Sequence, residues 1–156
     1  MPSCRAADHG SPPVCPANGR PSRPVPRRTV ESLVRPELRA ALRAQPYSLC
    51  ESPDCDVVYV AAAGDHVVTK DELSVRVGFK EHEDPVPLCY CFGVDRAAIR
   101  AEVRLRGDSD AQRDITARVR AGECRCEDTN PAGGCCLPDI AHALREARAL
   151  HAQRRL

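Results

Sequence analysis

Cysteine is the residue type in this chain whose number and spacing point to chemistry. Six of the ten cysteines lie between positions 89 and 136, beside prolines and glycines that let the backbone turn several sulfurs toward one point. Four thiolates can hold a 2Fe-2S cluster, and four can also hold a structural zinc ion. The residues alone leave open a redox cluster, structural zinc, or free and redox-active thiols. The three short groups are Cys89 with Cys91, Cys124 with Cys126, and Cys135 with Cys136.

Composition narrows the class of protein. The chain has 156 residues, with 23 basic against 22 acidic side chains and a formal net charge of +1, so nothing requires nucleic acid or an anionic membrane as a partner. It contains no apolar run long enough for membrane insertion and no signal-peptide core, so we expect a cytoplasmic protein with few disulfides. Three tyrosines, two phenylalanines and no tryptophan leave few large side chains for a core. We therefore expect bound metal to supply part of the stability that a larger apolar core would give.

The first half of the chain predicts a tail, a short helix and strands. Residues 1–28 carry seven prolines, which predicts a tail without regular structure. Helical spacing begins at Thr29, a candidate N-cap, and restarts at Pro36. The β-branched run at 56–62 predicts a strand that returns antiparallel at 67–68. Alternation over 75–79 predicts another strand with one buried face, because Val75, Val77 and Phe79 alternate with Arg76, Gly78 and Lys80.

The second half predicts helices. Asp95 can cap one helix, Asp108 or Ser109 a second, and Pro138 can open a third. Each cysteine group then lies close to a helix terminus, and a thiolate near a helix N-terminus gains from the partial positive charge there. The fold class predicted for the whole chain is therefore α+β.

Several long stretches resemble a known family. The segment VPLCYCFG at 86–93, followed later by Cys135-Cys136-Leu137, resembles the 2Fe-2S domain of bacterioferritin-associated ferredoxins. A longer resemblance, from about residue 15 to the end, is to the N-terminal domain of CopZ-type copper chaperones. The stretches that carry it are TVESL at 29–33, CESPDCDVVYV at 50–60, LSVRVGFKEHEDPVPLCYCFG at 73–93 and AGECRCEDTNPAGGCCLPDIAHAL at 121–144.

The CopZ resemblance implies two metal centres in two modules. A proline-rich tail at 1–28 would precede a zinc-binding strand module at 29–84 and a helical 2Fe-2S module at 85–156, which is similar to the ferredoxin relatives. Cys89 and Cys91 match the family's first pair of cluster ligands. One further ligand is expected from each of the other two groups, and the assignment made here is Cys126 and Cys136, with Cys124 and Cys135 as their rivals.

The zinc ligands implied by the resemblance are Cys15, Cys50 and Cys55. The family usually has Cys-Pro-x-Cys in its N-terminal part, but this chain has Asn18 at the second cysteine position. An amide is a poor zinc ligand. We therefore expect Cys4 to be the fourth ligand, with His9 and Asn18 as alternatives.

The expected function is electron transfer in the handling of copper or another heavy metal. The sequence has no Met-x-Cys-x-x-Cys loop, so copper is expected to travel on a separate metal carrier, and the protein would also need a redox donor. A Cu(II) reductase activity is left open. The alternative is a structural zinc-binding adaptor without a redox role. The histidines without a second ligand at metal spacing are expected on the surface: His66, His82, His142 and His151.

Overall fold

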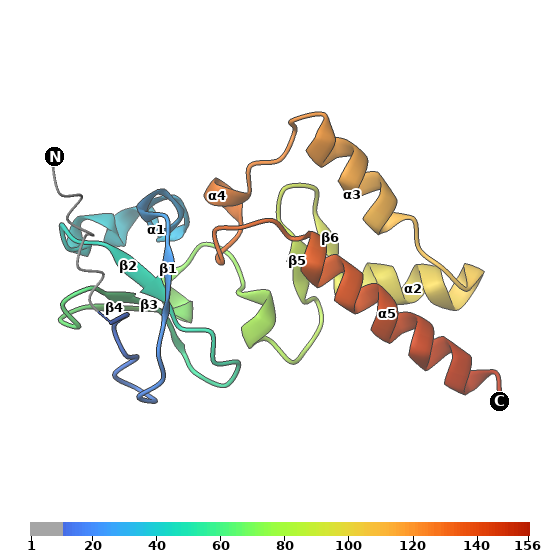
Figure 1. Cartoon of the computed structure of the whole chain (residues 1–156), viewed down its shortest axis with the longest axis horizontal. Coiled ribbons are helices and arrows are strands. Elements are labelled where there is room, and N and C mark those ends of the chain that lie inside the picture. The colour runs from blue at the N-terminus through green and yellow to red at the C-terminus, as the bar shows by residue number, and fades with distance from the viewer. Residues whose placement is uncertain (1–10) are drawn as a thin grey trace, which may run out of the picture.

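A small antiparallel sheet and a group of helices form the two ends of the molecule in the computed structural model (Figure 1). The structure describes residues 11–156, so the predicted ligands Cys4 and His9 lie outside it. Helix α1 packs beside the sheet, whereas α2, α3 and α5 form the other end, with α4 and the β5–β6 hairpin between them. No helix in residues 11–156 is both long and apolar enough to cross a membrane.

The sheet contains four antiparallel strands in sequence order. All five residues of the inner strand β3 are buried, which explains its continuous apolar run of Val, Val, Tyr, Val and Ala. The strand predicted at 56–62 and its antiparallel return at 67–68 are thereby confirmed. The strands are β1 (Arg23–Val25), β2 (Tyr47–Leu49), β3 (Val57–Ala61) and β4 (Val67–Thr69).

The N-terminal segment is more ordered than its prolines suggested. The expectation that residues 1–28 lack regular structure is wrong for β1, which pairs with β2. Pro24 is tolerated there because β1 is an edge strand of the sheet. Thr29 is not an N-cap, since α1 (Arg27–Leu33) already begins after Pro26. Its buried hydroxyl instead donates to the carbonyl of Glu127 at 2.7 Å.

The strand predicted over 75–79 is wrong. Residues Gly78–Lys80 form a 3-10 turn, and two further 3-10 segments span Pro36–Ala41 and Lys70–Glu72. Phe79, expected inside, is 39% exposed, whereas Lys80, expected outside, is 1% exposed. The alternation of residue types was misleading here, because the Lys80 ammonium donates hydrogen bonds to backbone carbonyls in the interior. These bonds offset the free-energy cost of burying its charge.

The second half is helical, as predicted, but it opens with a hairpin that the sequence analysis missed. The Asp95 cap is confirmed, since its carboxylate accepts the Ala98 N–H at 2.8 Å. Asp110, rather than Asp108 or Ser109, occupies the N-cap of α3. Pro138 lies in the first turn of α5, as expected. The elements are β5 (Pro87–Cys89), β6 (Val94–Asp95), α2 (Arg96–Arg106), α3 (Ala111–Arg120), α4 (Cys126–Thr129) and α5 (Leu137–Arg154).

The apolar interior is divided between the two ends. One core joins α1 to the sheet, and a second joins α2, α3 and α5 around Ile99, Ile115 and Ile140. Two cysteines, Cys89 and Cys136, belong to this second core. The α1 helix also packs on α4, so the segment that carries Cys126 lies against the sheet end of the molecule.

Candidate metal centres

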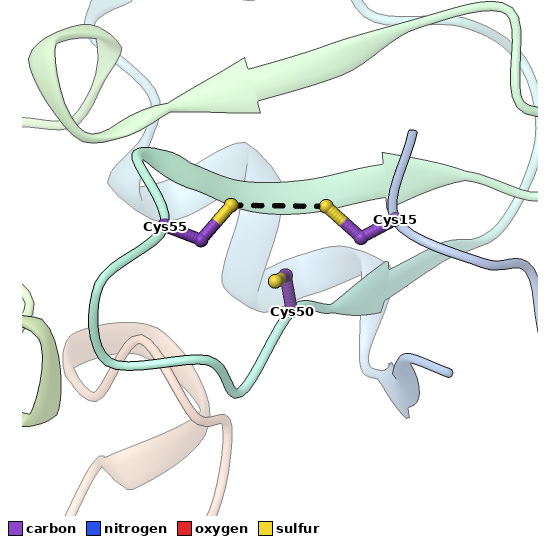
Figure 2. A group of neighbouring side chains, drawn as sticks. All are labelled: Cys15, Cys50 and Cys55. Carbon is purple, nitrogen blue, oxygen red and sulfur yellow. Dashed lines mark hydrogen bonds between the residues drawn. The ribbon is translucent and has the colours of Figure 1, made fainter. Parts of the chain in front are cut away.

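Cys15, Cys50 and Cys55 form a compact group of sulfurs at the margin of the sheet (Figure 2). All three sulfurs lie within 4.8 Å of one another, and the Sγ atoms of Cys15 and Cys55 are 3.8 Å apart. Two thiolates on one tetrahedral zinc ion, with Zn–S bonds of about 2.3 Å, stand about 3.8 Å apart. The group therefore fits three ligands of a single zinc ion.

Backbone hydrogen bonds fix each of these cysteines. Cys15 precedes a tight turn, and its carbonyl accepts the Gly19 N–H at 2.7 Å. Cys50 directly follows β2 and donates its N–H to Val58 on β3 at 2.8 Å. Cys55 closes the predicted turn by donating to the Ser52 carbonyl at 3.3 Å. The three thiols thus converge from two segments that the sheet holds together.

The buried Lys80 ammonium lies under the loop at 50–55. It donates to the carbonyls of Ser52 at 2.7 Å and Cys55 at 3.1 Å. Burial lowers the pKa of Lys80, and the neighbouring thiols act in the opposite direction. Burial also raises the pKa of Cys15. For Cys50 burial is outweighed by hydrogen bonds, first from the Ser52 backbone, and by the Lys80 charge, so its pKa falls to about 7. Lys80 thus favours thiolate at this site.

Asn18 faces the thiols as a hydrogen-bond donor. Its Nδ2 lies 3.6 Å from the Sγ of Cys50, and its Oδ1 accepts the Arg20 N–H at 2.9 Å. With the oxygen engaged elsewhere, the amide is oriented to stabilise a thiolate rather than to bind zinc. The fourth zinc ligand stays a prediction.

The helical end brings a second set of cysteines together. The Sγ atoms of Cys91 and Cys126 are 3.8 Å apart, although 35 residues separate them. The Arg125 N–H donates to Cys91 at 3.1 Å, and the Thr129 hydroxyl lies 3.2 Å from the same sulfur. Burial and the Cys91 sulfur raise the pKa of Cys126 to about 12.

Cys89 and Cys136 lie next to this pair, in the helical core. Cys89 ends β5 and is 1% exposed, and Cys136 precedes α5 and is 2% exposed. Burial raises the pKa of Cys136, and so does a hydrogen bond with the Cys89 thiol. A 2Fe-2S cluster takes two thiolates on each iron, and Cys91 with Cys126 and Cys89 with Cys136 offer two neighbouring pairs of thiols. The residues therefore fit a 2Fe-2S cluster, and their assignment as ligands stays a prediction.

The rival cysteines are more exposed than Cys89 and Cys136. Cys135 is exposed and Cys124 is partly exposed, and both line an open surface hollow beside Arg28, together with Cys126. Within residues 11–156, the cysteines of the zinc site are the one group of three or more ligand-type residues around a single point. The four histidines bond elsewhere or are solvated: His66 contacts Tyr47, His82 contacts Asp54, His142 contacts Glu146, and His151 is partly exposed.

The sequence did not reveal two side chains that contact the cysteine-bearing loops. Lys80 was placed on the solvent face of a strand, although one signal was available, because it is one of only two lysines in a chain whose other basic residues are arginines. Tyr90 was passed over between two cysteines. Its hydroxyl accepts the Gly78 N–H at 2.9 Å and donates to the Arg76 carbonyl at 2.7 Å. No sequence pattern marks those long-range contacts.

Comparison with known proteins agrees with this geometry. Residues 12–74 match the family model of the CopZ zinc binding domain. The copper chaperone CopZ of Archaeoglobus fulgidus is 36% identical over 109 residues, which are 69% of this chain and 50% of that protein. The X-ray structure of the N-terminal domain of Archaeoglobus fulgidus CopZ superposes with a TM-score of 0.68 at 31% identity, covering 83% of this chain and 96% of that domain. The chain spans about half the length of the chaperone it matches.

Proposed function

This chain belongs to the family of CopZ-type N-terminal domains, and on that premise we propose that it is an electron carrier in metal handling. It carries a zinc-binding domain of CopZ type and a three-cysteine metal site. The observation that supports the redox part is the pairing of Cys91 with Cys126 at 3.8 Å beside the buried Cys89 and Cys136.

We assign these four cysteines to a 2Fe-2S cluster, which would supply reversible transfer of one electron. The chain's own part is to hold and shield the thiolates. The Arg125 N–H donates to the Cys91 sulfur, and such a bond stabilises negative charge on it. Burial of Cys89 and Cys136 keeps water from half of the ligand set. Cys91 and Cys126 are partly exposed, which leaves that side open to a redox partner.

The zinc site has a structural role in this proposal. Cys15, Cys50 and Cys55 would hold the ion together with Cys4, which lies outside the described residues. A closed thiolate site keeps no open position for a substrate. The zinc ion would then tie the N-terminal segment to the sheet, without chemistry of its own.

The metal served is proposed to be copper or another thiophilic ion, by analogy with the chaperone relative. Partners would be a cytoplasmic carrier of that metal and a low-potential redox donor. In the test, dithionite-reduced and desalted protein is mixed with substoichiometric Cu(II) under argon. One equivalent of protein should be reoxidised for each Cu(I) formed. Tight Cu(I) binding without reoxidation would contradict an electron carrier and indicate a chaperone.

The Cu(II) experiment needs a control for free thiols, because thiols also reduce Cu(II). Cys91→Ser serves as this control, since it loses one predicted cluster ligand and keeps the exposed Cys135 and the partly exposed Cys124. The variant should form Cu(I) far more slowly. Equal rates for the two proteins would assign the reduction to thiols.

One observation also favours a second candidate, a structural zinc protein that recruits a partner. The Cys91 to Cys126 distance of 3.8 Å equals the Cys15 to Cys55 distance at the zinc site. Two tetrahedral zinc sites would accommodate both pairs. Metal analysis separates the candidates, because zinc sites hold no iron or sulfide.

A further inference from the structure

One short segment, residues 76–80, touches both metal centres, and we call it the strap. At one end, Lys80 donates to the carbonyls of Ser52 and Cys55 in the zinc loop at 2.7 and 3.1 Å. At the other end, the Gly78 N–H and the Arg76 carbonyl both bond the Tyr90 hydroxyl. The strap therefore lies between the loop that carries Cys50 and Cys55 and the turn that carries Cys89 and Cys91.

The contact between the strap and the hairpin is tight. A Cβ atom added to Gly78 would lie 2.0 Å from the carbonyl oxygen of Pro87 on β5, so only glycine permits this approach. Tyr90 is partly buried, and its hydroxyl makes two backbone hydrogen bonds to the strap. Gly78 and Lys80 belong to the same 3-10 turn. A displacement of Lys80 would therefore displace Gly78, whose N–H bonds the Tyr90 hydroxyl.

We propose that the strap couples the two centres, with Lys80 and Tyr90 as positioning residues for the cluster cysteines. Zinc bound by Cys50 and Cys55 fixes the carbonyls that hold Lys80. The strap then fixes Tyr90, and Tyr90 holds its neighbours Cys89 and Cys91. Loss of zinc should loosen these two thiolates and accelerate iron release. This inference rests on the 2Fe-2S assignment of the proposed function.

A second tyrosine offers a matched control. Tyr59 on β3 donates its buried hydroxyl to the Pro131 carbonyl at 2.7 Å, and so ties the loop between Cys126 and Cys136 to the sheet. Tyr59 bonds neither the strap nor the zinc loop through its hydroxyl. Tyr59→Phe and Tyr90→Phe each remove one hydrogen-bonded hydroxyl near the cluster cysteines, but only Tyr90→Phe removes the proposed connection.

The test is a double-mutant cycle on iron release to excess chelator, followed by loss of visible absorption. Cys15→Ser removes a zinc ligand that makes no hydrogen bond to the strap. It should accelerate release about tenfold, since the loosened strap loses the equivalent of one hydrogen bond. In the Tyr90→Phe background the acceleration should fall to about twofold or less, whereas the Tyr59→Phe background should retain all of it. Equal acceleration in the wild-type and Tyr90→Phe backgrounds would overturn the proposal.

Lys80→Met tests the same connection in a protein that keeps every cysteine. It should also accelerate iron release, and Lys70→Met, at the more exposed of the two lysines, should not. Hydrogen exchange gives a readout that needs no cluster: the Gly78 amide should exchange faster in Cys15→Ser and in Lys80→Met. An unchanged Gly78 rate in both variants would overturn the coupling. Absence of iron from the wild-type protein would instead refute the proposed function.

Discussion

The two cysteine-rich regions differ in how their sulfurs are arranged. At the zinc site, Cys15, Cys50 and Cys55 surround one point within 4.8 Å. At the helical end the sulfurs form pairs: Cys91 lies beside Cys126 at 3.8 Å, and Cys89 and Cys136, which interact with each other, are buried. One compact group suits a single ion, whereas two pairs suit a binuclear centre. The same residue type thus predicts different metals when its grouping differs.

The regions also differ in what holds the cysteines. The zinc thiols are fixed by sheet hydrogen bonds and by the buried Lys80. The paired thiols depend on loops between a hairpin and short helical segments, and two cysteines of these loops, Cys124 and Cys135, are left to solvent in part or in full. We therefore expect substitutions to have sharply unequal effects at the helical end and more uniform effects at the zinc site.

The largest expected effect is on iron content. Cys91→Ser should abolish or strongly alter the visible absorption and the EPR signal of the reduced protein, because Cys91 contacts Cys126 and accepts the Arg125 N–H. Cys89→Ser and Cys136→Ser should do the same. Cys135→Ser is the matched control and should be mild, as this thiol is exposed. Full iron in the Cys91 variant would refute the ligand assignment.

The next largest effect is expected on zinc content, and measuring it identifies the fourth zinc ligand. If Cys4 completes the site, Cys4→Ser should lower zinc content. The loaded cluster should keep its spectrum, although it should release iron to a chelator faster. His9→Ala and Asn18→Ala are the comparisons. Asn18→Ala should alter zinc affinity only modestly, because Asn18 donates to Cys50 rather than facing the site with its oxygen. Loss of zinc in the Asn18 variant alone would make the amide a ligand.

Deleting residues 1–10 should lower zinc content as Cys4→Ser does. This deletion spares the Pro13 carbonyl, which accepts the Ser22 N–H at 3.1 Å. Unaltered zinc after the deletion would exclude both Cys4 and His9 as ligands.

A smaller effect is expected on the stability of the fold, at the contact between the strap and the β5–β6 hairpin. Gly78→Ala should destabilise the fold by about 1–3 kcal/mol, the usual cost of overpacking, because its new Cβ would lie 2.0 Å from the Pro87 carbonyl. Gly134→Ala is the matched control, since nothing lies within 4 Å of the added atom. Thermal unfolding measures both variants. Equal melting temperatures would show that strap and hairpin can separate at little cost.

The smallest expected effect is on the free energy of unfolding, and it concerns helix capping at the helical end alone. Asp95→Ala should cost about 1 kcal/mol, because a carboxylate that caps a helix is lost. Asp110 occupies the N-cap of α3 without a capping bond, so Asp110→Ala should cost less. Chemical denaturation of the two variants gives the comparison. A larger loss for Asp110→Ala would contradict the capping assignment at the start of α2.

The predictable parts of the fold were those with local signals. The run of β-branched residues at 56–62 and the Asp95 cap both depend on neighbours in sequence, and both are confirmed. The strand over 75–79 failed because contacts with Ser52 and Cys55, more than 20 residues away, decide where Lys80 points. Residue alternation carries no information about such partners.

The convergence of Cys15, Cys50 and Cys55 was predictable for a different reason. Cysteine spacing singled out the residues, and the CopZ resemblance separated Cys50 and Cys55 from the later groups. The sequence could not show that Asn18 turns its nitrogen toward Cys50, or that a strap lies between the centres. Both features depend on side-chain orientation, which follows from the packed fold rather than from residue type.

The most direct test is the metal content of protein purified anaerobically with its visible spectrum recorded. We expect a red-brown protein with about two irons and two sulfides per chain, as one 2Fe-2S cluster requires. We also expect one zinc ion, held by the compact thiol group of Cys15, Cys50 and Cys55. A colourless protein that holds zinc without iron or sulfide would contradict the redox assignment and favour the structural zinc adaptor.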